Sequence, residues 1–203
     1  EFGWNSYGYT ELVNHALIRK HGFKKWYELM QGSIREPAAV YGTQDDVEGE
    51  KIRALNLTGK IVELGVGGRK TLKDSIGIDL IPEGQTIDTL GKTKSVANIK
   101  GDVSMPLPLE DGSVDAFIAR HILEHLQNTI EVLRNWKVKL KDGGKLIIAV
   151  PDGSKMLDIL LNPEHKISFT KKSLKDILEA VGYKVLSQED SGNNISFISI
   201  CEN

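Results

Sequence analysis

The chain has 203 residues, of which 40% are hydrophobic and 27% charged, which is enough apolar material for the core of one α/β domain with an appendage. The formal net charge is −2 and the lysines are scattered, so we expect no nucleic-acid partner. No apolar run approaches the roughly 18 residues of a membrane-spanning helix. The single cysteine, Cys201, excludes an internal disulfide, and no signal-peptide pattern is present, so we expect a cytoplasmic protein.

The first part of the chain has helical patterns only. Thr10 is suited to cap a first helix, residues 23–30 form a second pattern, and residues 44–55 form a weaker one that Gly49 interrupts. We therefore predict a helical leader over residues 1–57 that serves as a lid, followed by one α/β domain over residues 58–203. The lid contains several aromatic residues, whose ordinary role is packing against the domain.

From Lys60 onward, short β-rich runs alternate with helical patterns and glycine turns, which is typical of βαβ units around a parallel sheet. The predicted strands are residues 60–64, 75–80, 96–100, 114–119, 144–150, 183–188 and 195–201. The predicted helices are residues 121–140 and 171–181, the second capped by Thr170 and ended by Gly182. The first crossover is short, so its helix must be reduced to about one turn at residues 69–73.

A glycine-rich turn follows the first predicted strand. Gly65 and Gly67 permit a positive φ and let a ligand approach the backbone closely. Asp79 ends the next strand, where a carboxylate is suited to accept hydrogen bonds from two ribose hydroxyls. Lys70 stands where the dinucleotide fingerprint requires its third glycine, and no Gly-Lys-Ser/Thr follows, so neither a dinucleotide site nor a P-loop is predicted. The alternative without a ligand is a plain strand-to-helix turn.

Downstream segments resemble the class I S-adenosylmethionine-dependent methyltransferases, of the small methyltransferase-11-like type that acts on small molecules or sugars. The matching segments, which cover residues 60–201 in order, are Val62-Glu63-Leu64-Gly65-Val66-Gly67, Gly77-Ile78-Asp79-Leu80, Gly101-Asp102-Val103, the run from Leu107 to Phe117, His121-Ile122-Leu123-Glu124-His125-Leu126, the run from Leu140 to Leu146, Val150-Pro151-Asp152, and His165-Lys166-Ile167-Ser168-Phe169-Thr170. The resemblance implies a Rossmann-like α/β fold, with a seven-stranded, mostly parallel sheet, helices on both faces and an antiparallel last strand.

The resemblance also implies S-adenosylmethionine as the cofactor and a role for each matching position. At the methionine end, Glu63 would anchor the amino group, and Arg120 and His121 would border the methionine and methyl group. Gly65 and Gly67 would line the methionine and ribose, and Asp79 would hold the ribose hydroxyls. Leu80 would lie against the adenine, whose edge Asp102 and the Val103 N–H would bind. Two departures concern the methionine pocket: the usual third glycine is Arg69, and the crossover is truncated. A solvated Arg69 and an Arg69 that reaches a carboxylate or phosphate are both consistent with the sequence.

A hydroxyl acceptor must lose a proton, and histidine titrates near neutral pH. His121 and His165 are the predicted catalytic residues, because His121 follows the fourth strand and His165 lies in a loop at the same edge. For His125 we favour a packing role. The segment His121 to His125 also matches the inverted zinc-protease motif H-x-x-E-H. A zinc protease of that type also needs a different surrounding fold and a third zinc ligand on a helix. The sequence pattern shows neither, so we predict no metal.

Arg120-His121 stands where related families that methylate amide or exocyclic nitrogens carry Asn-Pro-Pro-Tyr or Asp-Pro-Pro-Tyr. We therefore expect methyl transfer to an oxygen of a small molecule or sugar, by in-line displacement with a histidine base. A cofactor-binding protein without catalysis is the alternative from another class, and a zinc hydrolase is a remote one.

Overall fold

The computed structural model describes residues 46–87, 93–155, 162, 164–192 and 195–203. The helices predicted near Thr10 and at residues 23–30 lie outside these residues, and so does most of the predicted leader. The described elements are α3 (Val47–Arg53), β1 (Ile61–Leu64), β2 (Ile76–Asp79), β3 (Thr86–Ile87), β4 (Thr93–Lys94), β5 (Ile99–Lys100), β6 (Val114–Arg120), the 3-10 helix η2 (Leu123–His125), α4 (Thr129–Lys139), β7 (Leu140–Pro151), α5 (Lys171–Val181), β8 (Lys184–Asp190) and β9 (Ser196–Glu202).

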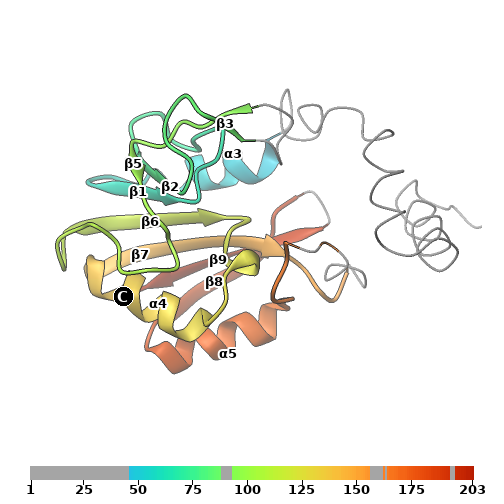
Figure 1. Ribbon diagram of the computed structural model, residues 1–203. Coiled ribbons are helices and arrows are strands. Elements are labelled where there is room, and N and C mark those ends of the chain that lie inside the picture. Colours follow the sequence, from blue (N-terminus) through green and yellow to red (C-terminus); the bar gives the residue numbers. More distant parts are fainter. Residues whose placement is uncertain (1–45, 88–92, 156–161, 163, 193–194) are drawn as a thin grey trace, which may run out of the picture. The chain divides into compact units, whose positions relative to one another are not determined.

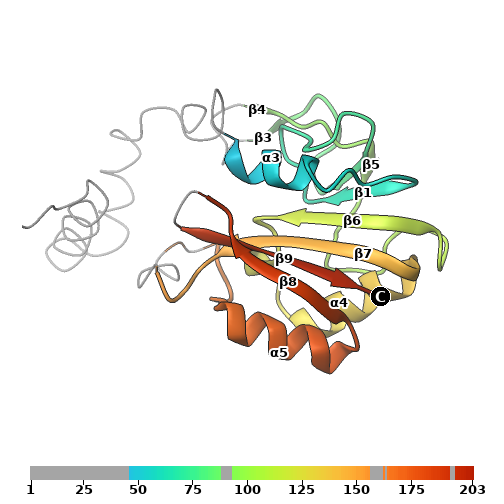
Figure 2. The ribbon, with the colours of Figure 1, turned by 180° about the vertical axis from the view of Figure 1, so that it is seen from behind.

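Seven strands form one sheet in the order β5-β2-β1-β6-β7-β9-β8 (Figures 1 and 2). The pairs from β5 to β7 are parallel, and β9 runs antiparallel to both β7 and β8. The predicted seven-stranded, mostly parallel α/β fold with an antiparallel last strand is confirmed. The sheet also positions the site, because the carboxyl ends of β1, β2, β5 and β6 meet at one edge.

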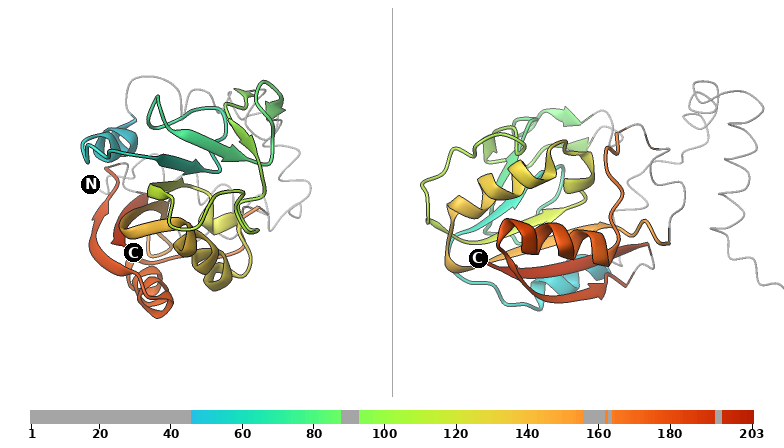
Figure 3. Two further views of the ribbon diagram at one scale, coloured as in Figure 1. Left: turned by 90° about the vertical axis from the view of Figure 1, so that its left-hand side faces the viewer. Right: turned by 90° about the horizontal axis from the view of Figure 1, so that it is seen from below.

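The two faces of the sheet are covered by different helices (Figure 3). Alternation along β6 and β7 explains this: Phe117 and Ala119 face the cluster that contains Trp136 of α4 and Leu174 of α5. Ala116, Ile118, Ile147 and Ala149 face the opposite cluster, which contains Ile52 of α3. Successive side chains in a strand point to opposite faces, so β6 and β7 are hydrophobic where both faces are covered, at residues 116–119 and 146–150. None of the described helices is long and apolar enough to cross a membrane.

Two predicted helices differ from the observed elements. Residues 65–75 form turns and bends without the expected turn of helix at residues 69–73. The predicted helix over residues 121–140 begins only at Thr129, because His121 (φ 50°) and Asn128 (φ 55°) adopt left-handed backbone conformations. Apolar spacing in residues 121–128 therefore reflects a 3-10 turn rather than a continuous helix. The short β3–β4 hairpin was not predicted, and β7 begins four residues before the predicted start of that strand.

α3 lies within the predicted leader, yet its Ile52 is buried against β6, β7 and β9. Asp46 caps this helix by accepting a hydrogen bond from the Gly49 N–H at 3.0 Å. α3 is thus a component of the sheet's cover. The division of the chain into leader and domain at residue 57 stays a prediction.

Replacing Thr170 with alanine tests the predicted cap of α5. Thr170 Oγ1 accepts from the Ser173 N–H at 3.1 Å, and Ser173 Oγ accepts from the Thr170 N–H at 2.9 Å, which forms a capping box. T170A should lower the free energy of unfolding by about 1 kcal/mol, because the Ser173 N–H at the helix start loses its side-chain acceptor. Chemical denaturation measures the change. The exposed Lys172→Ala should change it by less than about 0.5 kcal/mol, and equal losses in both variants would contradict the cap.

Candidate functional site

The glycine turn after β1 has the backbone that its sequence requires. Gly65 has φ 65° and Gly67 has φ 57°, in the left-handed region that disfavours other residues. The Gly65 N–H donates to the Ile78 carbonyl at 2.8 Å, and the Gly67 N–H donates to Asp79 Oδ2 at 2.9 Å. The turn is therefore tied directly to the carboxyl end of β2, so that the glycines and Asp79 form one unit.

Glu63 is buried in β1 and its carboxylate holds the loop that replaces the missing helix. Oε2 accepts from the Thr71 N–H at 2.7 Å, while Oε1 accepts from the Leu72 N–H at 2.9 Å and from Ser75 Oγ at 2.6 Å. The two backbone N–H groups have no helical partner in this loop, so the Glu63 carboxylate satisfies them. All three hydrogen bonds are charge-assisted. The predicted contact of Glu63 with a methionine amino group stays a prediction, and it would have to share these oxygens.

The residues predicted to bind the adenosine lie at the ends of two neighbouring strands. β2 pairs with β5 in parallel, with Asp79 opposite Lys100. Asp79 and Asp102 therefore lie at the same edge of the sheet, at the carboxyl ends of these two strands. Asp79 Oδ1 accepts from the Ile81 N–H at 3.1 Å, and Leu80 beside it is 60% exposed. Asp102 is exposed and accepts from Ser104, and within the described part of the chain the Val103 N–H makes no hydrogen bond. A nucleoside would find an unpaired donor, an exposed apolar side chain and two carboxylates here.

Arg120 ends β6 on the other side of β1, where it is bound by two carboxylates from the start of α3. Its Nε donates to Glu48 Oε1 at 2.9 Å and its Nη2 donates to Asp46 Oδ1 at 2.7 Å. Burial alone raises the pKa of Glu48, but His121 and Arg120 more than offset this effect and lower the pKa to about 2. Arg69, half exposed, also donates to Asp46 at 2.9 Å, so of its two predicted environments it takes the one with a carboxylate.

His121 lies next to Arg120 and is held by two glutamates. Its Nε2 is 3.2 Å from Glu48 Oε1, and its Nδ1 is 3.5 Å from Glu124 Oε1. Burial alone lowers the pKa of His121, but the nearby carboxylates of Glu124 and Glu48 raise the pKa to about 10. An imidazolium whose nitrogens both face carboxylates cannot accept a proton at neutral pH. The geometry therefore argues against His121 as the general base, although it does lie at the expected sheet edge.

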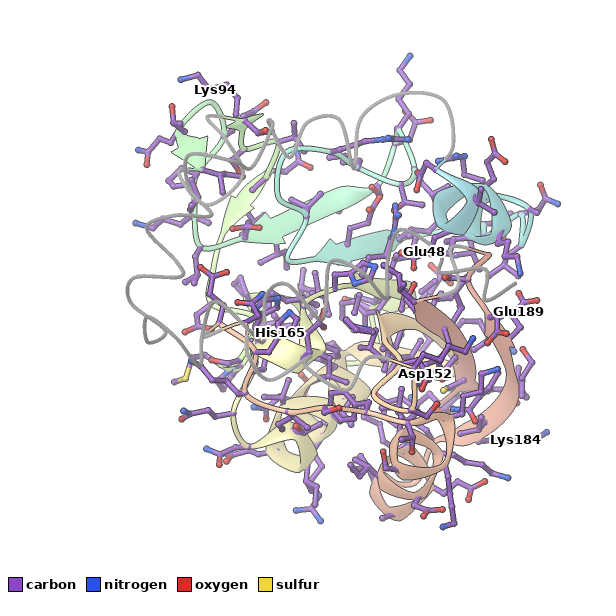
Figure 4. All side chains as sticks on the ribbon, turned by 90° about the vertical axis from the view of Figure 1, so that its right-hand side faces the viewer. Glu48, Lys94, Asp152, His165, Lys184 and Glu189 are labelled. Carbon is purple, nitrogen blue, oxygen red and sulfur yellow. The ribbon has the colours of Figure 1, made fainter. Side chains whose placement is uncertain are left out.

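His165 lies beside His125 of η2, and Figure 4 shows it apart from Glu48, the carboxylate that holds Arg120. Its ring meets that of His125 edge to face, with centroids 4.8 Å apart. His125 Nδ1 lies 3.1 Å from the Glu164 carbonyl oxygen, and its Nε2 lies 4.0 Å from Glu124 Oε1. The structure thus brings the two histidines together around a buried glutamate, which the sequence analysis did not predict.

Two side chains pack directly on the glycine turn. A Cβ at Gly65 would come within 2.5 Å of Ile122 Cγ1, and a Cβ at Gly68 within 1.9 Å of Thr93 Cγ2.

Two surface hollows, of about 530 and 320 Å³, lie at the opposite edge of the sheet, lined by residues such as Leu140 and Gly143. Convergent polar groups, rather than the size of a hollow, therefore mark the carboxyl edge as the candidate site.

The functional residues that sequence reasoning missed are Asp46 and Glu48. Both stand in a weak helical pattern, and they pair with Arg120, which lies 74 and 72 positions away along the chain. The acidic first turn of α3 was the only local signal, and such turns are common at helix starts without any site.

Comparison with known proteins agrees with this geometry. A family model described as a methyltransferase domain matches residues 50–188. A crystal structure of a SAM-dependent methyltransferase from Archaeoglobus fulgidus superposes with a TM-score of 0.64 over 82% of this chain and 97% of that one, at 18% identity.

Two curated proteins are similar in sequence. An uncharacterized protein of Methanocaldococcus jannaschii is 30% identical over 137 residues, which are 62% of this chain and 65% of that protein. A protein of Mycolicibacterium smegmatis, described as a probable S-adenosylmethionine-dependent methyltransferase, is 30% identical over 82 residues, 39% of this chain and 32% of that protein. The chain therefore spans less than two thirds of the length of either relative.

The strand order, the antiparallel β9 and the glycine turn beside an acid-ended β2 define a class I methyltransferase fold. The family model covers more than half of the chain, so the chain belongs to the methyltransferase domain family. The resemblance predicted from the sequence is confirmed for this class.

Replacing Glu48 with glutamine tests the charge network. At pH 7 the free energy of unfolding should fall by roughly 3 kcal/mol, because Arg120 and His121 lose a buried counter-charge. Since the pKa of Glu48 is about 2 instead of 4.5, its stabilisation is full above pH 4.5 and is lost as the pH falls toward 2. Denaturation of E48Q should therefore depend less on pH in this interval than denaturation of the wild type.

Glu50→Gln is the matched control, because Glu50 is exposed on the same helix. It should change the free energy of unfolding by less than about 0.5 kcal/mol. If E48Q and E50Q unfold alike, α3 is not held to the sheet through Glu48.

Proposed function

We propose that this chain binds S-adenosylmethionine at the carboxyl edge of β1, β2 and β5 and transfers its methyl group to an oxygen of a small molecule or sugar. The observation that carries the proposal lies at the ends of the neighbouring strands β2 and β5, where Asp79 and Asp102 meet the Val103 N–H, a donor without a hydrogen bond among the described residues. In open α/β sheets, ligands bind outside the carboxyl ends of the strands, where the strand order reverses. Here β1 lies at that reversal, between β2 and β6.

Each residue of this edge has a role that fits its surroundings. Asp79 uses one lone pair of each oxygen on the Gly67 and Ile81 N–H groups and keeps others for a ribose diol. Leu80 offers apolar surface to an adenine face, and Asp102 and Val103 offer an acceptor and a donor to its edge. S-adenosylmethionine supplies a methyl group that its positively charged sulfur already activates, so the chain has to align the acceptor and exclude water.

The cations Arg120 and His121 border the methionine end of the proposed site. Asp46 and Glu48 balance these charges and fix both side chains in place. His121 thereby serves as a fixed positive charge, which suits the carboxylate of a methionine group. Of the two predicted catalytic histidines, this proposal keeps only His165 as the group that removes the acceptor proton.

The choice of an oxygen acceptor rests on the sequence that follows β6. Amide and exocyclic nitrogen methylation relies, in related families, on a Pro-Pro-Tyr segment after the corresponding strand, and this chain has Arg120-His121 there. The net charge of −2 supports a small acceptor over a nucleic acid. A binding protein without turnover is the second reading, and the two readings differ in whether methylated product forms.

Cofactor binding is tested by Asp102→Asn. The asparagine keeps an oxygen for Ser104, but it presents an N–H₂ group toward the adenine amino group, so two donors would meet. We expect calorimetry to show roughly tenfold weaker binding of S-adenosylmethionine, equivalent to about 1.4 kcal/mol. Asp142→Asn is the control, because Asp142 is exposed at the opposite edge of the sheet. Failure of the wild type to bind the cofactor would overturn the proposal.

Methyl transfer is tested with S-adenosylmethionine labelled in its methyl group and a panel of acceptors bearing hydroxyl, amine or carboxyl groups. We expect label to enter a hydroxyl-bearing small molecule or sugar, with S-adenosylhomocysteine released in equal amount. Label in an amine would refute the choice of oxygen. Tight cofactor binding without transfer to any acceptor would favour the second reading.

A further inference from the structure

Glu124 is the most unusual ionisable group in the described part of the chain. It is 1% exposed, and neither carboxylate oxygen makes a hydrogen bond within that part. Its near neighbours are His121 Nδ1 at 3.5 Å and His125 Nε2 at 4.0 Å, which are too far or too poorly directed for hydrogen bonds. The His121 imidazolium supplies one nearby positive charge. A buried carboxylate whose two oxygens accept no hydrogen bond is still costly, and a bound cation would complete its surroundings.

The surroundings of Glu124 offer the ligands of a metal ion. Glu124, His125 and His165 each present one ligand atom, and these atoms lie within 4.8 Å of one another. Two ligands of a tetrahedral zinc ion, each bound at 2.0–2.2 Å, are roughly 3.3 Å apart, so modest side-chain rotations would close the site. Both histidines are partly exposed, which leaves an entry path from solvent.

His125 is already oriented as a metal ligand. Its Nδ1 lies 3.1 Å from the Glu164 carbonyl oxygen, and a hydrogen bond to a carbonyl places the proton on Nδ1. Nε2 then carries the lone pair and faces Glu124. Metal-binding histidines commonly donate their second ring nitrogen to a backbone carbonyl in this way. The backbone also holds the loop, since the Lys166 and Ile167 N–H groups donate to the Glu124 carbonyl at 2.7 and 3.2 Å.

We propose that Glu124, His125 and His165 form a binding site for a divalent transition metal ion, with zinc as the ion that best fits two imidazoles and one carboxylate. Three protein ligands leave a fourth tetrahedral position open, as in catalytic rather than structural zinc sites. Magnesium and calcium prefer oxygen ligands and should not compete. The proposal revises the prediction of no metal, because a loop provides the third ligand that the sequence motif lacked, and it does not rest on cofactor binding.

The site differs from the inverted zinc-protease arrangement. That motif needs both histidines of H-x-x-E-H on one helical face, whereas His121 has φ 50° and directs Nε2 to Glu48. His165 takes the place of His121. With an ion bound, His165 would serve as a ligand and not as the proton acceptor. The ion would then act as a Lewis acid that lowers the pKa of a bound acceptor hydroxyl.

Zinc binding by the full chain tests the proposal. The protein is stripped with a chelator, and zinc alone is titrated against a chromophoric competitor. We expect one tightly bound zinc per chain, with at least tenfold weaker binding in Glu124→Gln, His125→Ala and His165→Ala. Glu131→Gln is the matched control, because Glu131 is exposed at the start of α4, and it should bind within twofold of the wild type. Magnesium at the same concentration should not displace zinc.

A second readout separates a metal ligand from a merely structural residue. Cobalt in place of zinc should give visible absorption typical of a tetrahedral site, and His165→Ala should change this spectrum while circular dichroism of the metal-free protein stays the same. If E124Q does not fold, H165A alone decides, because His165 is a partly exposed loop residue. Absence of tight zinc, or wild-type affinity in H165A, would overturn the proposal. Cofactor calorimetry on the stripped protein reports separately on the proposed function.

Discussion

The pairing of Arg120 with Asp46 and Glu48 is the interaction on which the rest of the site depends. It joins the end of β6 to the start of α3, two segments that are far apart in sequence. The same Glu48 holds His121 and accepts from Ser196 Oγ at the start of β9. One buried carboxylate therefore connects a helix and two strands. A buried ion pair adds little stability over an apolar contact, but removing one partner is costly, so its main effect is to specify one arrangement.

A similar use of carboxylates compensates for the short first crossover. Without a helix between β1 and β2, the backbone donors of residues 65–75 need other partners, and Glu63 and Asp79 provide them. The same two positions are those that the methyltransferase resemblance assigns to the cofactor. Arg69, which stands where the family has a third glycine, turns to Asp46 and so belongs to the charge network. The two departures are connected through Thr71, whose N–H donates to Glu63 and whose Oγ1 accepts from Arg120 Nη1 at 3.2 Å.

The strands were easier to predict from the sequence than the helices and the charge state of the site. A strand was predicted at each of the seven positions of the main sheet, because most of these strands contain a β-rich apolar run between turn residues. Of the predicted strand at residues 96–100, only Ile99–Lys100 pairs with β2 as β5. The predicted helix 121–140 was wrong over its first part, since Ile122 and Leu126 have helical spacing but Ile122 packs on Gly65. The predicted base His121 lay at the expected edge, and its charge state depends on Glu48, which was assigned to the leader. Nothing in the local pattern around residue 48 indicates a partner beside β6.

The sequence by itself determined the class of protein. Strand alternation, glycines at positions of positive φ and acids at strand ends are local features, and their order along the chain is specific for one fold and one family. Only the tertiary structure decided which charges meet: Arg120 with α3, His121 between two glutamates, and Glu124 buried beside His125 and His165. The reason is physical, because the energy of a charge depends on its burial and on the groups within a few ångströms, and folding brings those groups from distant parts of the chain.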